Sequence, residues 1–430
     1  MSPGDGKNTG DWAVGGSGAT GDALRRQRRK RPPPAEQAKR LLSGEAWREF
    51  CRSLERAGET ILHADVPGGD AARAEGFRYL LGLALTGIRQ ATEQADPDFP
   101  VWIRNPDSAS KWGAENADNQ YLWACLHPDR SYRIRGARES ALDFLIEVKE
   151  GYMQLGDERN FATLWARDLA VGRDGRFEIL LAAREPSPRP ANFLPLHPDA
   201  RYVCVRQYLA DWSRETPARF EIECLESAGL APEPLSPAAV GSMLDSAGEW
   251  VDVSARFWDE WVQQLRRDHV RGRLAAPRSF VGGADDILYG NDWYRIDADE
   301  ALILESEVPR AHYWAFQLCD TWFKTMDYTN RQSSLNHTQA RLDPDGRFRC
   351  VIAHRDPGFA NWLDTAGQHE GMIQYRYVFT GTKPLPTARI VRFAELASAL
   401  PAGAPRVTPE ERRAEIAARQ AHLRRREPAS

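Results

Sequence analysis

A four-residue motif recurs in this chain at a distance of about 170 residues, which constrains the fold more than any other feature. Asp174-Gly175-Arg176-Phe177 returns 171 residues later as Asp345-Gly346-Arg347-Phe348. Further matches, spaced 169 and 170 residues apart, are Asn192-Phe193-Leu194 with Asn361-Trp362-Leu363, and Arg206 with Arg376. The spacing is nearly constant and far longer than the period of a stacking repeat. The sequence therefore predicts two domain-sized copies of one unit.

Each copy has the texture of a β-sandwich, with short alternating apolar segments broken by Gly, Pro and Asp turns. In the first copy these segments are 100–104, 121–125, 132–136, 144–148, 177–180 and 202–206. In the second copy they are 302–304, 313–316, 348–352 and 372–377. The Asp- and Gly-rich stretch 282–300 predicts an acidic loop between them.

Helical spacing appears on both sides of the first copy and at the end of the chain. Two helices are expected before residue 96, and the second, through Phe77, Leu81, Leu85 and Ile88, is apolar enough that we expect it to be buried. The helical period returns at 236–273. We expect the two copies to pack on each other through this intervening helical segment. The charged stretch 408–426 predicts an exposed terminal helix.

The predicted fold class is α+β but mainly β: two tandem, internally duplicated antiparallel β-sandwiches with an N-terminal helical pair and a helical spacer. We expect a disordered basic tail over 1–42, helices over 43–95, the first sandwich over 96–230 and the spacer over 231–280. The second sandwich is expected over 281–398, and a charged helix and tail over 399–430.

The charge pattern gives little reason to expect a nucleic-acid or membrane partner. The formal net charge of −4 supplies no attractive field for polyanions. The basic run 25–31 is interpreted as part of a solvated tail, because no aromatic residue alternates with its arginines. Binding of nucleic acid or of a membrane surface through this run is the alternative. The most apolar stretch, 79–88, is too short to span a bilayer.

Cysteine usage and the N-terminal residues suggest a compartment. The six cysteines form no C-x-x-C pair and lie within apolar or amphipathic runs, as small buried hydrophobic residues do in a reducing environment. The first residues lack the charged and apolar regions of a secretory signal. We expect a cytoplasmic protein; the oligomeric state stays open.

Several of these segments resemble proteins that carry domain of unknown function 1214. The resemblance rests on 343–348, 354–358, 361–363 and 376–377 in the second copy, and on 113–121 and 132–136 in the first. It covers roughly residues 45–395 and is most specific at Asn-Trp-Leu and Tyr-Arg-Ile-Arg-Gly. The resemblance implies a tandem β-sandwich fold with helical elements, and it brings no established activity.

His354 and Asp356 are the candidate catalytic pair. Two residues apart at a predicted strand end, they would share a face and could act as base and acid. The alternative is an exposed histidine beside a loop-capping aspartate, and the first copy has Ala183 at the position of His354. No histidines stand at metal-ligand spacing, so we predict no metal site, and no cofactor is identified. The motifs of α/β-hydrolases, P-loop enzymes and Rossmann folds are absent.

Candidate ligand-binding residues are polar and aromatic side chains in predicted loops and strands. They are Asn116, Asn119, Tyr121, Trp322, Asn361, Trp362 and Arg376. The sequence favours a protein that binds or transforms a small, mostly apolar molecule of lipid, steroid or isoprenoid type, in an aromatic-lined cleft between the halves. A noncatalytic binding or assembly module is the alternative, in which the asparagines cap turns. Whether the protein is an enzyme stays open.

Overall fold

The computed structural model describes residues 31–63, 66–270, 272–280, 283–284 and 286–427. Most of the basic run 25–31 lies outside these residues. Four helices form one side of the molecule: α2 (Pro34–Leu42), α3 (Glu45–Leu62), α4 (Gly69–Glu93) and the long α5 (Pro237–Asp268). The tail expected through residue 42 is therefore wrong at its end. Helix α2 begins with a proline at its first turn and packs on α5, where Gln37 and Arg40 both donate to Asp245.

The first half contains nine strands in two sheets. The inner sheet has the order β1-β2-β8-β4-β5 and the outer sheet the order β7-β6-β3-β9. The strands are β1 (Ile103–Arg104), β2 (Asn119–Cys125), β3 (Tyr132–Ala137), β4 (Asp143–Lys149), β5 (Asn160–Trp165), β6 (Arg176–Ala182), β7 (Phe193–Pro195), β8 (Tyr202–Tyr208) and β9 (Arg219–Cys224).

The second half repeats this arrangement strand for strand, apart from β1. Its inner sheet has the order β10-β16-β12-β13 and its outer sheet the order β15-β14-β11-β17. The strands are β10 (Ile287–Arg295), β11 (Glu300–Ser306), β12 (Ala311–Cys319), β13 (Ser334–Asn336), β14 (Phe348–Ala353), β15 (Trp362–Asp364), β16 (Glu370–Thr380) and β17 (Thr387–Arg392). The predicted duplication and fold class are confirmed. In both copies one short pair, β6 with β7 and β14 with β15, is parallel rather than antiparallel.

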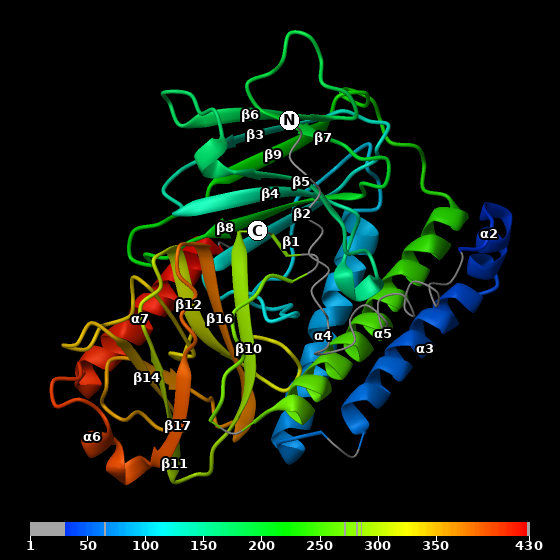
Figure 1. The fold of residues 1–430 in the computed structure, drawn as a ribbon. Helices are drawn as coiled ribbons and strands as arrows, with labels where there is room; N and C mark the ends of the chain where they lie inside the picture. The colour runs from blue at the N-terminus through cyan, green and yellow to red at the C-terminus, as the bar shows by residue number, and fades with distance from the viewer. Residues whose placement is uncertain (1–30, 64–65, 271, 281–282, 285, 428–430) are drawn as a thin grey trace, which may run out of the picture.

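The four sheets stack in the order outer, inner, inner, outer (Figure 1). Strand alternation explains this order. On β4, Phe144, Ile146 and Val148 face the first sandwich core, while Leu145 faces the other half. On β12, Phe316 belongs to the second sandwich core. Tyr313 and Ala315 of the same strand face the first half. The two inner sheets therefore pack directly on each other.

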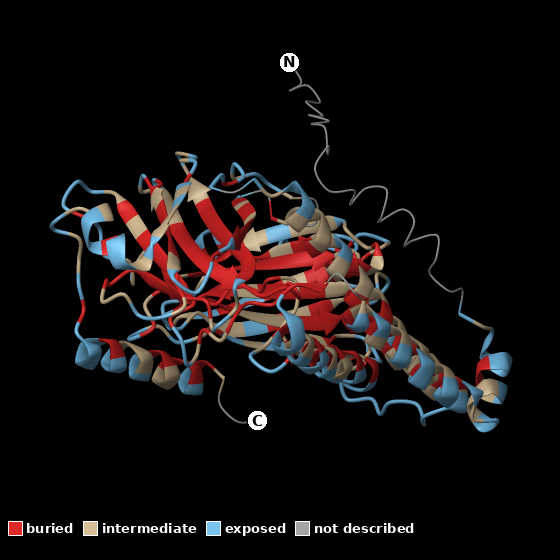
Figure 2. Ribbon diagram, turned by 90° about the horizontal axis from the view of Figure 1, so that it is seen from below, coloured by how far each residue is buried: buried red, intermediate tan, exposed pale blue. Residues whose placement is uncertain are grey.

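This direct packing corrects our expectation that the two copies pack on each other through the intervening helical segment. Helix α5 instead packs beside the junction of the two inner sheets, where its residues Phe257, Trp258 and Val262 are buried against residues of the second half. Its other side contacts α2, α3 and α4 (Figure 1). Figure 2 shows burial concentrated in the strands, whereas the helices alternate between buried and exposed faces.

Helix α4 is less buried than its composition predicts. Leu81 is 72% exposed, and Phe77, Leu85 and Ile88 are also exposed. The buried face is formed largely by small residues instead. A methyl group on Gly76 would lie 2.7 Å from the Trp322 ring. Glycines allow this close approach, so the larger apolar residues face outward.

The predicted acidic loop at 282–300 is wrong over most of its length, because β10 runs along one edge of the second inner sheet. Gly290, which suggested a loop, is required by packing. A Cβ there would lie 2.0 Å from the Tyr375 ring on β16. A glycine inside a strand commonly marks such a close approach.

The terminal helix α7 (Pro409–Arg426) begins as predicted, with a capping box between Thr408 and Glu411. The expectation that it is exposed is wrong for one face. Arg412, Arg419 and Arg426 are buried and donate to protein oxygens, including the Phe359, Ser334 and Ala117 carbonyls respectively. Because it contacts both halves, α7 joins them across their junction.

Two further expectations from the sequence concern the burial of the cysteines and the absence of a membrane-spanning segment. Five of the six cysteines are buried as expected, whereas Cys51 is exposed on α3. Among the described helices, none is both long enough and apolar enough to cross a membrane.

Candidate functional site

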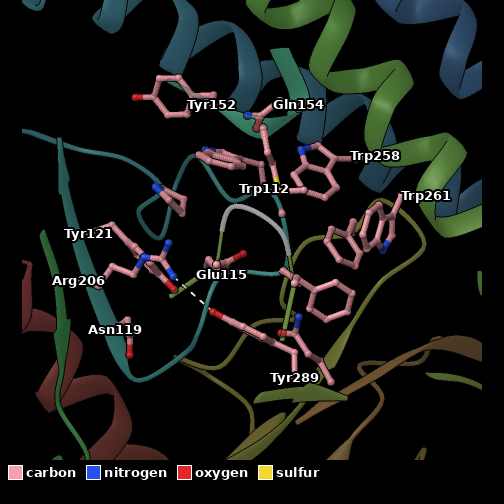
Figure 3. Close-up of a pocket in the computed structure, with 18 of the residues that line it drawn as sticks. Trp112, Glu115, Asn119, Tyr121, Tyr152, Gln154, Arg206, Trp258, Trp261 and Tyr289 are labelled. Atoms are coloured by element: carbon pink, nitrogen blue, oxygen red, sulfur yellow. Dashed lines mark hydrogen bonds between the residues drawn. The ribbon is translucent and has the colours of Figure 1, made fainter. Parts of the chain in front are cut away.

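A pocket with a cavity volume of about 170 Å³ lies where the two inner sheets and α5 meet (Figure 3). Its walls are rich in aromatic side chains. The aromatic side chains are Trp112, Tyr121, Trp123, Tyr152 and Tyr208 from the first half, Trp258 and Trp261 from α5, and Phe280, Tyr289 and Phe323 from the second half. Trp258 stacks on Phe323 at 4.8 Å between ring centroids. Such walls suit an apolar or aromatic molecule.

Two arginines at equivalent positions of the repeat also line the pocket. Arg206 lies on β8 opposite Tyr121 of β2, and Arg376 lies on β16 opposite Tyr289 of β10. Each copy thus supplies an arginine and a tyrosine from neighbouring strands. Tyr289 contacts both cations. Its hydroxyl accepts from Arg206 Nη1 at 3.4 Å, and the Arg376 guanidinium lies 5.7 Å from its ring centroid.

The two arginines differ in their counter-ions. Arg206 Nε lies 2.9 Å from the Glu147 carboxylate, which also lies 3.5 Å from Lys149 Nζ. Glu147 stands opposite Cys204 on β8, and Gln317 stands opposite Gln374 at the equivalent place in the second copy. The second copy therefore has a neutral amide where the first has a carboxylate.

Arg376 is only 6% exposed and has no ion-pair partner among the described residues. Its Nη2 donates to the Ala114 carbonyl. Gln317, which stands where the first copy has Glu147, donates to the Glu115 carbonyl at 2.9 Å and to Gln374 Oε1 at 2.8 Å. A buried cation without a carboxylate partner is costly unless another group compensates its charge.

Glu115 is the buried acid of the pocket. Thr325 N donates to its Oε2 at 3.3 Å, and Lys111 Nζ lies 3.6 Å from Oε1. Burial raises the pKa of Glu115 to about 7, although the nearby Lys111 ammonium acts in the opposite direction. A carboxyl group that titrates near neutrality can exchange a proton with a bound molecule. Two other acids of the lining, Asp157 and Glu158, are partly exposed on the segment before β5.

Buried polar atoms without hydrogen-bond partners are concentrated around this pocket. Among the described residues that line it, these atoms are Glu115 Oε1, Asn119 Oδ1, Trp123 Nε1, Gln154 Oε1 and Nε2, Trp258 Nε1, Trp261 Nε1 and Asn291 Oδ1. Most buried polar atoms in folded proteins are paired. Their concentration at one cavity therefore indicates a place where a ligand or ordered water completes the bonding.

Of the seven ligand-binding candidates from the sequence, the structure brings Asn119, Tyr121 and Arg376 to the pocket. Asn116 lies directly behind it. Its backbone N–H donates to the Tyr121 hydroxyl at 3.0 Å, and its side chain bonds the Tyr313 hydroxyl. Asn116 therefore positions Tyr121 rather than lining the cavity.

The other three candidates lie in packed cores. Trp322 donates to the Ala72 carbonyl under α4, and Trp362 donates to the Ala353 carbonyl in the second half. Asn361 accepts from Arg341 N and donates to the Arg341 and Arg349 carbonyls. Its counterpart Asn192 makes the same three kinds of bond in the first copy, which identifies a shared structural role.

His354 and Asp356 also lie away from the pocket and have structural partners. The two ring nitrogens of His354 face Thr365 Oγ1 at 2.7 Å and the Ile296 carbonyl at 3.3 Å. Asp356 accepts from Gly358 N and from Arg412 Nε, both at 2.9 Å. The turn at Pro357 therefore directs the Asp356 carboxylate to α7, away from His354.

Sequence reasoning missed several pocket residues. Arg206 was matched to Arg376 by the repeat, and that equivalence is the signal that could have selected it. Tyr289 was missed because its strand was interpreted as a loop. Glu115 lies inside segment 113–121, which carried the family resemblance, but nothing local distinguishes its burial. Trp258 and Trp261 looked like ordinary members of a helix face.

No group of three or more His, Cys, Asp or Glu side chains is placed to hold a metal ion within the described part of the chain. The lining residues of the pocket present aromatic faces, the guanidinium groups of Arg206 and Arg376, the Lys149 ammonium, amides and the buried Glu115 carboxyl.

Comparison with known proteins agrees with the architecture. The model of the family described as "Protein of unknown function (DUF1214)" matches residues 127–211 and again 276–383, once in each copy. A crystal structure of an uncharacterized protein from Burkholderia cenocepacia is 33% identical, with a TM-score of 0.78, over 83% of this chain and 99% of that one. The VPA0106 protein from Vibrio parahaemolyticus is 12% identical, with a TM-score of 0.43, over 79% and 100% of the two chains. A search of curated proteins finds no match.

Proposed function

Because the chain belongs to the DUF1214 family, whose description assigns no activity, we propose from its pocket that the protein binds a small, mostly apolar molecule between its two halves. The observation that carries this proposal is the set of unpaired buried polar atoms around one aromatic cavity. Aromatic walls supply most of the binding energy by removing apolar surface from water, at roughly 25 cal/mol per Å². The polar atoms would fix the orientation of the molecule.

Backbone strain at the pocket supports the same proposal. Ala114 and Phe323 both line the cavity and have positive φ angles of 48° and 57°. A hydrogen bond of 2.6 Å from Ala114 N to the Phe323 carbonyl joins them. Non-glycine residues in this conformation are strained, and such strain is often found at binding sites.

A transformation of the bound molecule is the second candidate, and one observation favours it. Glu115 reaches the pocket as a buried carboxyl group whose pKa is raised to about 7 by burial. A group with this pKa can act as general acid or base at neutral pH. The reaction would be a proton transfer to or from the ligand, with Lys111 stabilising the carboxylate that remains.

The proposal can be tested with Nile red, an apolar neutral dye, followed by fluorescence titration of the full chain. We expect saturable binding to the wild type, and at least tenfold weaker binding to Trp261→Ala, because this substitution removes a pocket wall. Trp47→Ala, which truncates an exposed tryptophan on α3, should bind like the wild type. Equal binding by Trp261→Ala and the wild type would contradict the proposal.

A further inference from the structure

We infer that the molecule bound in the pocket carries one anionic group, and that this group binds at Arg376. The inference rests on the proposed function and specifies its ligand: an apolar body with a single anionic group, of which a carboxylate is the simplest. It is based on a difference between two arginines at equivalent positions of the repeat. Arg206 has a carboxylate beside it, whereas Arg376 has none among the described residues.

In the first copy the charge of the arginine is compensated within the protein. Glu147 is fully buried and lies 2.9 Å from Arg206 Nε. It also accepts from Asn160 Nδ2 at 3.1 Å, which holds the carboxylate in place. Arg206 therefore has an internal counter-ion, which it shares with Lys149.

In the second copy the same surroundings lack the carboxylate. Gln317 occupies on β12 the position that Glu147 occupies on β4. Gln317 stands opposite Gln374, two residues before Arg376, just as Glu147 stands opposite Cys204, two residues before Arg206. The buried acid of the lining, Glu115, lies beside Lys111, and no ion pair joins it to Arg376 among the described residues. The described part of the chain therefore leaves Arg376 buried, at the pocket, without an anion.

The surroundings of Arg376 are suited to recognising an anion. A guanidinium group presents several N–H donors in one plane and can bond both oxygens of a carboxylate. Of these donors, Nη2 is used by the Ala114 carbonyl. Tyr289, opposite Arg376 on β10, has its ring centroid 5.7 Å from the Arg376 guanidinium, and its hydroxyl accepts from Arg206. Low polarity in the aromatic walls strengthens such a charge pair.

A matched pair of probes tests the inference: 2-naphthoate and its neutral amide, 2-naphthamide, titrated calorimetrically into the full chain. We expect the wild type to bind the acid at least tenfold more tightly than the amide. In Arg376→Gln the preference should fall below about twofold, while affinity for the amide is retained, which also shows that the variant is folded. Arg135→Gln, on the exposed outer sheet, should keep the wild-type preference.

Gln317→Glu provides a second test, because it restores in the second copy the counter-ion of the first. An internal carboxylate should compete with the ligand and lower affinity for the acid at least tenfold, with little effect on the amide. Equal binding of acid and amide to the wild type would overturn this inference alone. Binding of neither compound would overturn the proposed function as well.

Discussion

Arg206 and Arg376 hold the same position in the two copies of the repeat, and both line one pocket between the inner sheets. Duplication alone would give two identical sites facing each other. The first copy keeps a buried carboxylate beside its arginine, whereas the second has Gln317 there. The two ends of the one pocket therefore differ in charge, although the repeat makes their arginines equivalent.

Gly290→Ala should lower the free energy of unfolding by about 3 kcal/mol, because its Cβ would overlap the buried Tyr375 ring. The Tyr375 hydroxyl donates to the Ala275 carbonyl, so the ring has little freedom to move. Urea denaturation measures the change. Gly58→Ala is the control, since open space surrounds that helical position. It should raise stability by about 0.5–1 kcal/mol, and equal effects of both substitutions would contradict the packing described.

Arg412→Ala should destabilise the protein by roughly 2–4 kcal/mol, because it leaves Gln332, Asp356 and the Phe359 carbonyl without their donor. Arg413→Ala removes only an exposed pair with Glu410 and should change stability by less than about 0.5 kcal/mol. Thermal and urea unfolding of both variants check this. A small effect at Arg412 would mean that α7 is not anchored to the second half as described.

Asn192→Ala and Asn361→Ala should each cost about 2–3 kcal/mol, because each removes the same set of backbone hydrogen bonds from its own copy. Neither substitution should alter Nile red binding. Loss of dye binding in Asn361→Ala, at unchanged stability, would return this residue to the ligand site that its sequence motif suggested.

Glu115→Gln should change how stability depends on pH. The folded-state pKa of about 7 lies above the ordinary value of 4.5, so the folded protein binds a proton more tightly than the unfolded chain does. This contribution to stability is full below pH 4.5 and is lost as pH rises to about 7. Relative to Glu115→Gln, the wild type should lose on the order of 3 kcal/mol across this window. Urea denaturation of both proteins between pH 4.5 and 8 measures it, and parallel curves would contradict the raised pKa.

The sequence predicted the architecture well because the signals for it were repeated. Four strand segments of the first copy, 132–136, 144–148, 177–180 and 202–206, had predicted counterparts in the second, and the helical periods of α3, α4 and α5 were long. Predictions failed where a glycine had a packing role rather than a turn role. Gly290 made a strand look like a loop, and the glycines of α4 turned an apolar surface outward.

The pocket was harder to predict than the fold. Local polarity in the sequence selected Arg376, Tyr121 and Asn119, which line the pocket. It selected Asn361 and His354 on equal grounds, but these two residues lie outside the pocket. Whether a strand residue reaches the pocket depends on which face of its sheet meets the other half. Strand alternation alone does not predict which face that is. The burial of Glu115 depends on Lys111 and Thr325, and Thr325 lies 210 residues away along the chain.

A crystal structure of the full chain soaked with 2-naphthoate would show whether an anionic ligand binds at Arg376 between the two halves. We expect the naphthalene ring between Trp258 and Trp261 on one side and the first half on the other, with its carboxylate at Arg376. A molecule bound outside the pocket, or one whose carboxylate faces solvent at the pocket mouth, would contradict this expectation.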